Sequence, residues 1–136
     1  MQAVRYRSGL DARTGRVITG RVHLAQSLAK IWLTRIDERV MLLDFGARLR
    51  SHLAEDITGA LALEIYDDLT TAVYRWEPEY RVAEMQFVSL TKIGGLGLRH
   101  GGKYYPEGRL GNFSIVEEFG GIASLARYET LARRTA

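Results

Sequence analysis

The chain of 136 residues contains no cysteine, so it has no disulfide framework, no thiolate metal site and no cysteine nucleophile. No apolar run approaches the roughly 20 residues that span a bilayer, and no signal peptide is visible at the N-terminus. These absences predict an intracellular protein without a membrane anchor. An apolar fraction of 46% and an aromatic fraction of 10% predict one folded domain with a modest core.

Lysine is scarce, with 3 lysines against 16 arginines. Arginine is enriched and lysine depleted at protein–protein interfaces, although a G+C-rich coding sequence would produce the same bias. The charge is also uneven: the net charge is +6 over residues 1–50, −6 over residues 51–90 and +3 over residues 91–136. Because nucleic-acid binders usually lack such an acidic block, this pattern favours protein partners and predicts salt-sensitive assembly.

Three stretches show the three- and four-residue apolar spacing of an amphipathic helix. The first follows Thr19, the predicted N-cap, and a short one begins at Asp44. The longest covers residues 59–76, with Asp56 or Thr58 as its N-cap. Its apolar residues recur about every four positions, which predicts one buried face and an acidic opposite face.

Strand patterns follow in the C-terminal half. After Pro78 apolar and polar residues alternate, which predicts a strand with one buried face. A change of apolar phase at Val88 predicts a bulge or burial on both faces. Seven of the 14 glycines lie between residues 94 and 111, where tight turns and short strands are expected, and the last strand is predicted over residues 109–118.

These patterns predict an α+β fold, in which two to three helices pack on a small antiparallel sheet. An extended N-terminal arm (residues 1–20) precedes the domain (residues 21–118). A C-terminal helical extension (residues 119–136) follows it, because Gly120-Gly121 breaks the strand pattern ahead of a helix expected over residues 122–134.

The carboxylates of Glu77 and Glu79 suggest a glycosidase, because a pair of acids beside a cleft can serve as proton donor and nucleophile. Pro78 separates them, however, and no neighbouring feature makes either one a proton donor. A charged rim around a buried Trp76 is therefore the favoured interpretation. The three histidines lie in separate elements without metal-ligand spacing, so no metal or cofactor is predicted.

Six fragments, read in order, point to one family. They are Gly9–Asp11, Thr14–Gly20, His23–Leu28, Thr34 with Arg39–Met41, Asp44–Leu49, and Trp76–Pro78. Together they resemble the W-type baseplate wedge proteins of contractile phage tails, which are related to the wedge subunit of type VI secretion baseplates. The resemblance implies a small α+β domain, no enzymatic activity and a place in the virion tail baseplate. It also implies that the protein joins wedge subunits around the tube and initiates sheath assembly.

The resemblance assigns wedge contacts to two segments. The predicted interface residues are Arg39, Asp44, Phe45, Gly46, Trp76, Glu77, Pro78, Glu79 and Arg81. The family has an arginine at the position of Glu79, and either Arg81 or a basic group on the partner could replace it.

Sheath subunits of such tails link by exchanging strands, so an initiator must offer an unpaired sheet edge. The predicted strand with Arg109, Phe113, Ile115 and Glu117 is the candidate edge, and an ordinary internal strand fits the pattern equally.

The expected partners are other baseplate wedge proteins and the sheath subunit, with the tail tube or hub as further neighbours. Neither nucleic acid nor membrane is expected as a partner. Three alternatives remain. The chain could come from a type VI baseplate or a tailocin, it could be a same-fold anti-adaptor that sequesters a regulator, or it could be a muramidase that uses Glu77.

Overall fold

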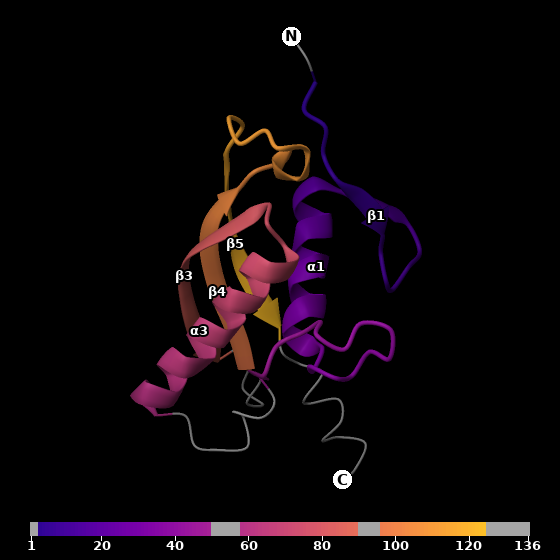
Figure 1. Cartoon of the computed structure of the whole chain (residues 1–136). Coiled ribbons are helices and arrows are strands. Elements are labelled where there is room, and N and C mark those ends of the chain that lie inside the picture. The colour runs from indigo at the N-terminus through magenta and orange to yellow at the C-terminus, as the bar shows by residue number, and fades with distance from the viewer. Residues whose placement is uncertain (1–2, 50–57, 90–95, 125–136) are drawn as a thin grey trace.

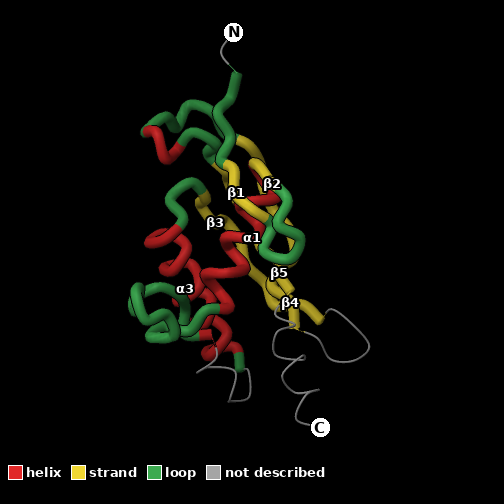
Figure 2. Tube along the Cα trace, turned by 90° about the vertical axis from the view of Figure 1, so that its right-hand side faces the viewer, coloured by secondary structure: helices red, strands yellow, loops and turns green. Residues whose placement is uncertain are grey.

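The computed structural model describes residues 3–49, 58–89 and 96–124, and it has an α+β architecture with helices on one face of a sheet (Figures 1 and 2). The elements are β1 (Ser8–Leu10), β2 (Val17–Thr19), α1 (Gly20–Leu33), α3 (Gly59–Trp76), β3 (Tyr80–Ser89), β4 (Leu96–Tyr104), the 3-10 helix η1 (Gly108–Leu110) and β5 (Glu117–Ser124). Strands β3, β4 and β5 form an antiparallel sheet in that order, and β1 and β2 form a separate hairpin. The predicted α+β class is confirmed.

The two long helices form where the apolar spacing predicts them. Helix α3 begins after Thr58, whose hydroxyl oxygen accepts a hydrogen bond from the backbone N–H of Leu61 at 3.2 Å. Asp56, the other candidate cap, lies outside the described residues. Helix α1 begins after Thr19 as predicted, although the Thr19 side chain makes no capping hydrogen bond.

The core lies between these helices and the sheet. It contains the buried apolar residues of α1 and α3 together with inward-facing strand residues, namely Leu24, Leu28, Ile31, Trp32, Leu61, Ile65, Leu69, Ala72, Val73, Tyr80, Leu98 and Tyr104. Trp32 joins the helices through a 3.3 Å hydrogen bond from its indole Nε1 to the carbonyl oxygen of Leu69. Of the helices in the described ranges, none has the length and hydropathy to cross a membrane.

The short helix predicted from Asp44 is wrong over residues 44–48, which form a turn and a single β-bridge. The backbone N–H of Ala47 donates to the carbonyl oxygen of Thr34 at 2.9 Å and closes the loop on itself. Gly46 allows this closure, because its φ is +125° and an added Cβ would overlap the Thr34 carbonyl. Helical geometry starts at Leu49, and the rest of that prediction lies outside the described residues.

The predicted bulge exists, but it lies between Val82 and Glu84 rather than at Val88. Ala83 is the extra residue of the bulge, and it is exposed. The alternation of inward-facing and outward-facing residues along β3 shifts by one position at this point. Gly102 lies opposite on β4, where an added Cβ would overlap the carbonyl of Arg81. The close approach of two backbones therefore fixes the bulge at this position.

The last strand begins eight residues later than predicted. The sequence predicts a strand over 109–118, whereas the structure has η1 and an irregular loop before β5 begins at Glu117. Gly120 and Gly121 lie within β5 instead of ending it, because Gly120 pairs with Gly101 across the ladder to β4. The start of the predicted C-terminal helix is corrected accordingly, since β5 continues to Ser124; the remainder lies outside the described residues.

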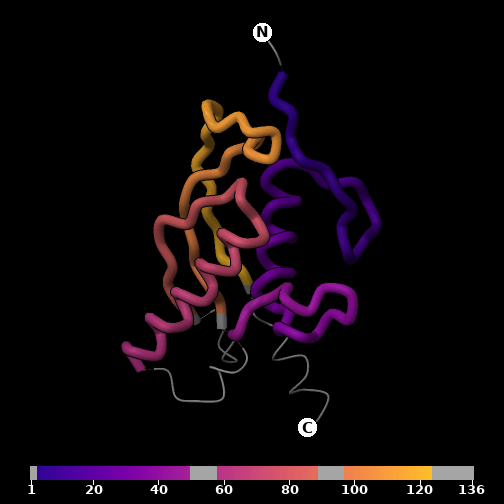
Figure 3. Tube along the Cα trace, in the orientation of Figure 1, coloured from indigo at the N-terminus to yellow at the C-terminus, as the bar shows by residue number. Residues whose placement is uncertain are grey.

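The N-terminal segment packs against the domain. Its β1–β2 hairpin lies along α1, where the Gln26 side chain accepts from the backbone N–H of Ala12 at 2.8 Å and donates to the carbonyl oxygen of Leu10 at 2.9 Å. In Figure 3 the indigo residues before β1 run beside the orange loop that joins β4 to β5. The segment predicted as an extended arm is thus tied to the rest of the chain.

Candidate partner interface

The segment from Trp76 to Arg81 forms a sharp corner between α3 and β3. The last turn of α3 closes with a hydrogen bond of 2.7 Å from the backbone N–H of Glu77 to the carbonyl oxygen of Val73. Pro78 cannot continue the helix, and the N–H of Tyr80 then returns to the carbonyl oxygen of Glu77 at 3.2 Å. The predicted change from helix to strand at Pro78 is confirmed.

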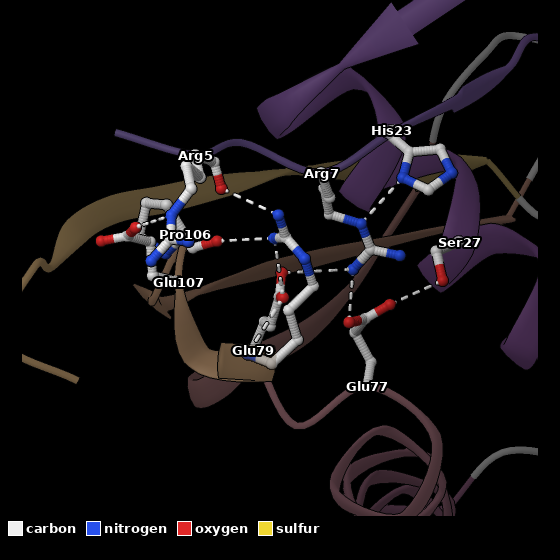
Figure 4. A network of polar contacts seen from close by, with 9 residues as sticks. Arg5, Arg7, His23, Ser27, Glu77, Glu79, Pro106 and Glu107 are labelled. Atoms are coloured by element: carbon white, nitrogen blue, oxygen red, sulfur yellow. Dashed lines mark hydrogen bonds and ion pairs between the residues drawn. The ribbon is translucent and has the colours of Figure 1, made fainter. Parts of the chain in front are cut away.

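Glu77 points inward at this corner, and only 4% of the residue is exposed. Its Oε1 forms an ion pair with Nη1 of Arg7, which comes from the N-terminal segment. Its Oε2 accepts a hydrogen bond of 2.7 Å from the hydroxyl of Ser27 on α1 (Figure 4). Glu77 therefore connects three parts of the chain and exposes little of its surface to solvent.

Glu79 is also buried, with 2% of the residue exposed. Its Oε1 accepts hydrogen bonds from the backbone N–H of Arg109 at 3.2 Å and from Nη1 of the same residue at 3.3 Å. Its Oε2 lies 3.6 Å from Nη1 of Arg7. Arg109 thus turns toward the corner and does not belong to a sheet edge.

Arg7 is the centre of this cluster. Its Nε donates to Nδ1 of His23 at 2.7 Å, which requires Nδ1 to carry no proton. Burial lowers the pKa of His23, and the positive charge of Arg7 lowers it further against the opposing effect of Glu77 and Glu79. The neutral imidazole is therefore the form that fits beside the guanidinium.

Arg5 extends the cluster to the loop that joins β4 to β5. Its Nε lies 3.0 Å from Oε1 of Glu107, and this hydrogen bond lowers the pKa of Glu107 despite the opposing effect of burial. The backbone carbonyl of Arg5 also accepts from Nη2 of Arg109 at 3.0 Å (Figure 4). We use the name "corner cluster" for these three guanidinium groups and three carboxylates: Arg5, Arg7, Arg109, Glu77, Glu79 and Glu107.

The predicted charged rim around a buried Trp76 is therefore wrong. Both glutamates are buried, because arginines far away in sequence neutralise them, whereas Trp76 is half-buried. Its ring packs edge-on against Phe45 with centroids 5.2 Å apart, and the guanidinium of Arg39 lies over Phe45 at 4.2 Å. Asp44 joins the same group through an ion pair: Nη2 of Arg75, the residue before Trp76, lies 3.1 Å from the carboxylate of Asp44. The two predicted interface segments do meet, through their aromatic residues.

Pro78 and Arg81 are the corner residues that face solvent. The guanidinium of Arg81 lies over the rings of Tyr105 and Phe113, at 5.6 and 5.9 Å from the centroids. Phe113 is 46% exposed and belongs to the loop before β5, as does the half-buried Ile115. Of the four residues predicted for the sheath edge, Glu117 alone lies in a strand.

Sequence reasoning missed the partners of the buried glutamates. Arg7, Ser27 and Arg109 lie 70, 50 and 30 residues away from the glutamates they contact, and nothing local identifies them. It also missed an exposed apolar loop, Val40–Leu43, in which Val40 is 87% and Met41 94% exposed. Four consecutive apolar residues between charged neighbours were its visible signal. Among the described residues, no group of histidine and acidic side chains is arranged to hold a metal ion.

Comparison with known proteins agrees with this architecture. The family described as "Baseplate wedge protein gp25" matches residues 19–92. "Baseplate protein W" of Escherichia phage P2 is 32% identical over 77 residues, which cover 57% of this chain and 67% of that protein.

Two solved structures share the fold. A chain of the postcontracted baseplate of pyocin R2 superposes with a TM-score of 0.56 at 19% identity, covering 87% of this chain and 98% of that one. A Geobacter sulfurreducens protein provisionally named a tail lysozyme superposes with a TM-score of 0.58 at 22% identity, covering 76% of this chain and 87% of that one. The family match extends from the N-cap of α1 through α3, the corner and β3. The chain therefore belongs to the baseplate wedge protein gp25 family, whose members are structural proteins of the virion tail baseplate.

Proposed function

We propose that this protein joins neighbouring wedge subunits of a contractile-tail baseplate and initiates the sheath, without catalysing a reaction. The observation that carries the sheath role is the position of β5. Among the described residues β5 pairs with β4 alone, so its outer edge can accept another strand. The proposed edge is thus residues 117–124.

The surface of β5 suits this role. Edge strands usually carry features that prevent unwanted pairing, such as inward charges or prolines. Strand β5 contains no proline and carries its two charges, Glu117 and Glu118, at its first two positions, whereas Ile122 near its other end is 55% exposed. Gly120 and Gly121 leave little side-chain bulk near the backbone. An incoming strand could therefore approach it closely.

Wedge contacts are proposed for the loop of residues 34–47 and the adjoining Trp76. Hydrogen bonds within the loop hold Val40 and Met41 in solvent, including one of 2.8 Å from the N–H of Asp37 to the carbonyl oxygen of Leu43. A braced loop loses little conformational entropy on binding. Exposed apolar side chains that adjoin one another are typical of protein interaction sites.

The corner cluster supports a non-enzymatic role. A glycosidase needs two carboxyl groups that reach substrate, one as a proton donor. Here the side chains of Glu77 and Glu79 are 6% and 3% exposed, and each carboxylate forms an ion pair with at least one arginine. Their arrangement is that of a structural ion cluster.

The sheath role can be tested with two neighbouring proline substitutions, Gly121→Pro and Ile122→Pro. Successive N–H groups in an antiparallel strand alternate between β4 and the free edge, so one proline removes an outward donor and the other breaks the ladder. Thermal unfolding identifies the variant that has lost a hydrogen bond to β4, because its melting temperature falls. The variant that keeps the wild-type melting temperature should enter baseplates but should fail to support sheath polymerisation, as seen by electron microscopy.

Normal sheath on that stable variant would refute the β5 assignment. Failure of the wild-type protein to bind any purified baseplate protein of the same tail would refute the wedge role as well. Glu77→Gln serves as the catalytic control, and cell-wall hydrolysis that is present in the wild type and lost in this variant would contradict the non-enzymatic proposal.

A further inference from the structure

We propose that Arg81 and Lys103 bind a carboxylate on an acidic segment of a neighbouring baseplate protein. This inference rests on the proposed wedge function and specifies the chemistry of one contact. The two cations lie on the face of the sheet opposite the helices, at the end of β3 and β4 nearest the corner. Within the described residues, neither makes an ion pair.

Arg81 and Lys103 are directly opposite each other in the β3–β4 register, and both are exposed. Like charges at opposite positions of an antiparallel pair repel each other and destabilise the ladder. A carboxylate that bridges the pair would convert this repulsion into attraction. The pairing is therefore costly in the free protein and favourable in a complex with an acidic partner.

The nearby acids leave these cations incompletely neutralised. The corner cluster is balanced without them, since its three guanidinium groups face three carboxylates. Glu118 lies opposite Lys103 on β5, and Glu84 lies over Gly101 in the next row of the sheet. The row formed by Arg81, Lys103 and Glu118 thus keeps one positive charge in excess.

The guanidinium of Arg81 is already oriented for binding. It lies over Tyr105 and Phe113, whose rings pack edge-on with centroids 5.5 Å apart. Gly108 packs closely against this arrangement, since an added Cβ would lie 3.2 Å from Cγ of Glu79 and 3.4 Å from both aromatic side chains. A guanidinium held by cation–π contacts keeps its N–H groups available for a carboxylate, and arginine with tyrosine is typical of binding hot spots.

A shallow recess adjoins Arg81 and indicates what should flank the acidic residue. It has a volume of about 340 Å³ and is lined by Tyr74, Pro78, Tyr80 and Arg81. Tyr74 is 54% exposed and offers an aromatic wall. The recess would accept an apolar side chain. The inferred ligand is therefore a segment with an aspartate or glutamate beside an apolar residue.

The test measures binding of wild-type, Arg81→Gln and Lys103→Gln proteins to each purified baseplate protein of the same tail, one at a time, by biolayer interferometry. Arg81→Gln should weaken one of these complexes by about tenfold or more, as expected for loss of a hot-spot arginine. Arg81→Lys should restore part of the affinity, since it keeps the charge but not the planar fork. Arg99→Gln is the matched control, because Arg99 is exposed on β4 and hydrogen-bonds to Gln86.

Carbodiimide cross-linking then locates the contact. The chain has 3 lysines, so mass spectrometry can assign each cross-link simply, and Lys103 should join an aspartate or glutamate of the partner. Wild-type binding that Arg81→Gln leaves unchanged would overturn this inference while leaving the wedge function intact. A cross-link from Lys103 to a second copy of this chain alone would also overturn it. Absence of any wild-type complex would refute both proposals.

Discussion

Replacement of Arg7 tests whether the corner cluster holds the N-terminal segment on the domain. Its side chain is 16% exposed, and it forms ion pairs with Glu77 and Glu79, whose side chains are almost fully buried. In Arg7→Met, Glu79 keeps Arg109, whereas among the described residues the carboxylate of Glu77 keeps the hydroxyl of Ser27 alone. Removing one partner of a buried ion pair costs about 3–5 kcal/mol. For a domain of this size that corresponds to a loss of roughly 10–20 °C in melting temperature.

The assay is urea unfolding at pH 7 of Arg7→Met, Glu77→Gln and the double variant. Glu77→Gln removes the carboxylate charge but leaves Arg7 with Glu79 and His23, so it should cost less than Arg7→Met. Once Glu77 is neutral, loss of Arg7 no longer strands a buried charge. The double variant should therefore be more stable than the sum of the single losses predicts, by about 2 kcal/mol of coupling.

Arg5→Gln is the matched control, because Arg5 lies two residues away on the same segment and its side chain is 69% exposed. Its partner Glu107 is buried but keeps a hydrogen bond of 3.0 Å from Nδ2 of Asn112, so the loss of stability should be smaller than that of Arg7→Met. Hydrogen exchange should also show faster exchange of residues 3–19 in Arg7→Met than in Arg5→Gln. Equal losses in the two variants, or full additivity in the cycle, would refute the reasoning.

Two further predictions concern the core and the loop. Burial lowers the pKa of His100 to about 4, so the unfolded chain takes up the proton first as pH falls. Between pH 6.5 and 4 the contribution of His100 to the free energy of unfolding should therefore fall by about 2 kcal/mol, a value reduced to allow for solvent screening. The urea midpoint of His100→Phe should fall less over that pH range than the midpoint of the wild type. Gly46→Ala should cost about 2–4 kcal/mol in urea unfolding through its clash with Thr34, whereas Gly15→Ala, at a φ of +73° with open space around it, should cost about 1 kcal/mol.

The helices could be predicted because their determinants are local. Apolar spacing and the Thr58 cap lie within the sequence of α3 itself, so the bounds Gly59–Trp76 follow directly. The same rule failed at Asp44, where Phe45 and Leu49 imitate the spacing of a helix. The conformation there depends instead on Gly46 and on its contact with Thr34, twelve residues earlier. A periodic pattern does not reveal a left-handed glycine that closes a loop.

The strands could likewise be predicted where their determinants are local, but not where they depend on a neighbouring strand. The alternation after Pro78 identifies β3, but the position of its bulge depends on Gly102, which belongs to the neighbouring strand. Gly120 and Gly121 look like a strand terminus when they are read alone. In the sheet, Gly120 fits because Gly101 lies opposite and the backbones approach closely, with the His100 carbonyl oxygen 3.0 Å from an added Cβ. Their meaning therefore depends on pairing that a single sequence does not display.

The corner illustrates how far a local motif can predict an interface. Trp76-Glu77-Pro78-Glu79 correctly indicates a turn, because proline acts on its own neighbours. The same motif does not reveal that Glu77 and Glu79 face inward, since that depends on Arg7 and Arg109. Once those partners are known, the exposed groups of the corner are Pro78 and the guanidinium of Arg81, which lies over the ring of Tyr105. An arginine in place of Glu79 could not occupy this buried site beside Arg7 and Arg109 without repulsion. Glu79 and the two arginines beside it therefore depend on one another, and a change of charge at position 79 should require compensating substitutions of Arg7 and Arg109.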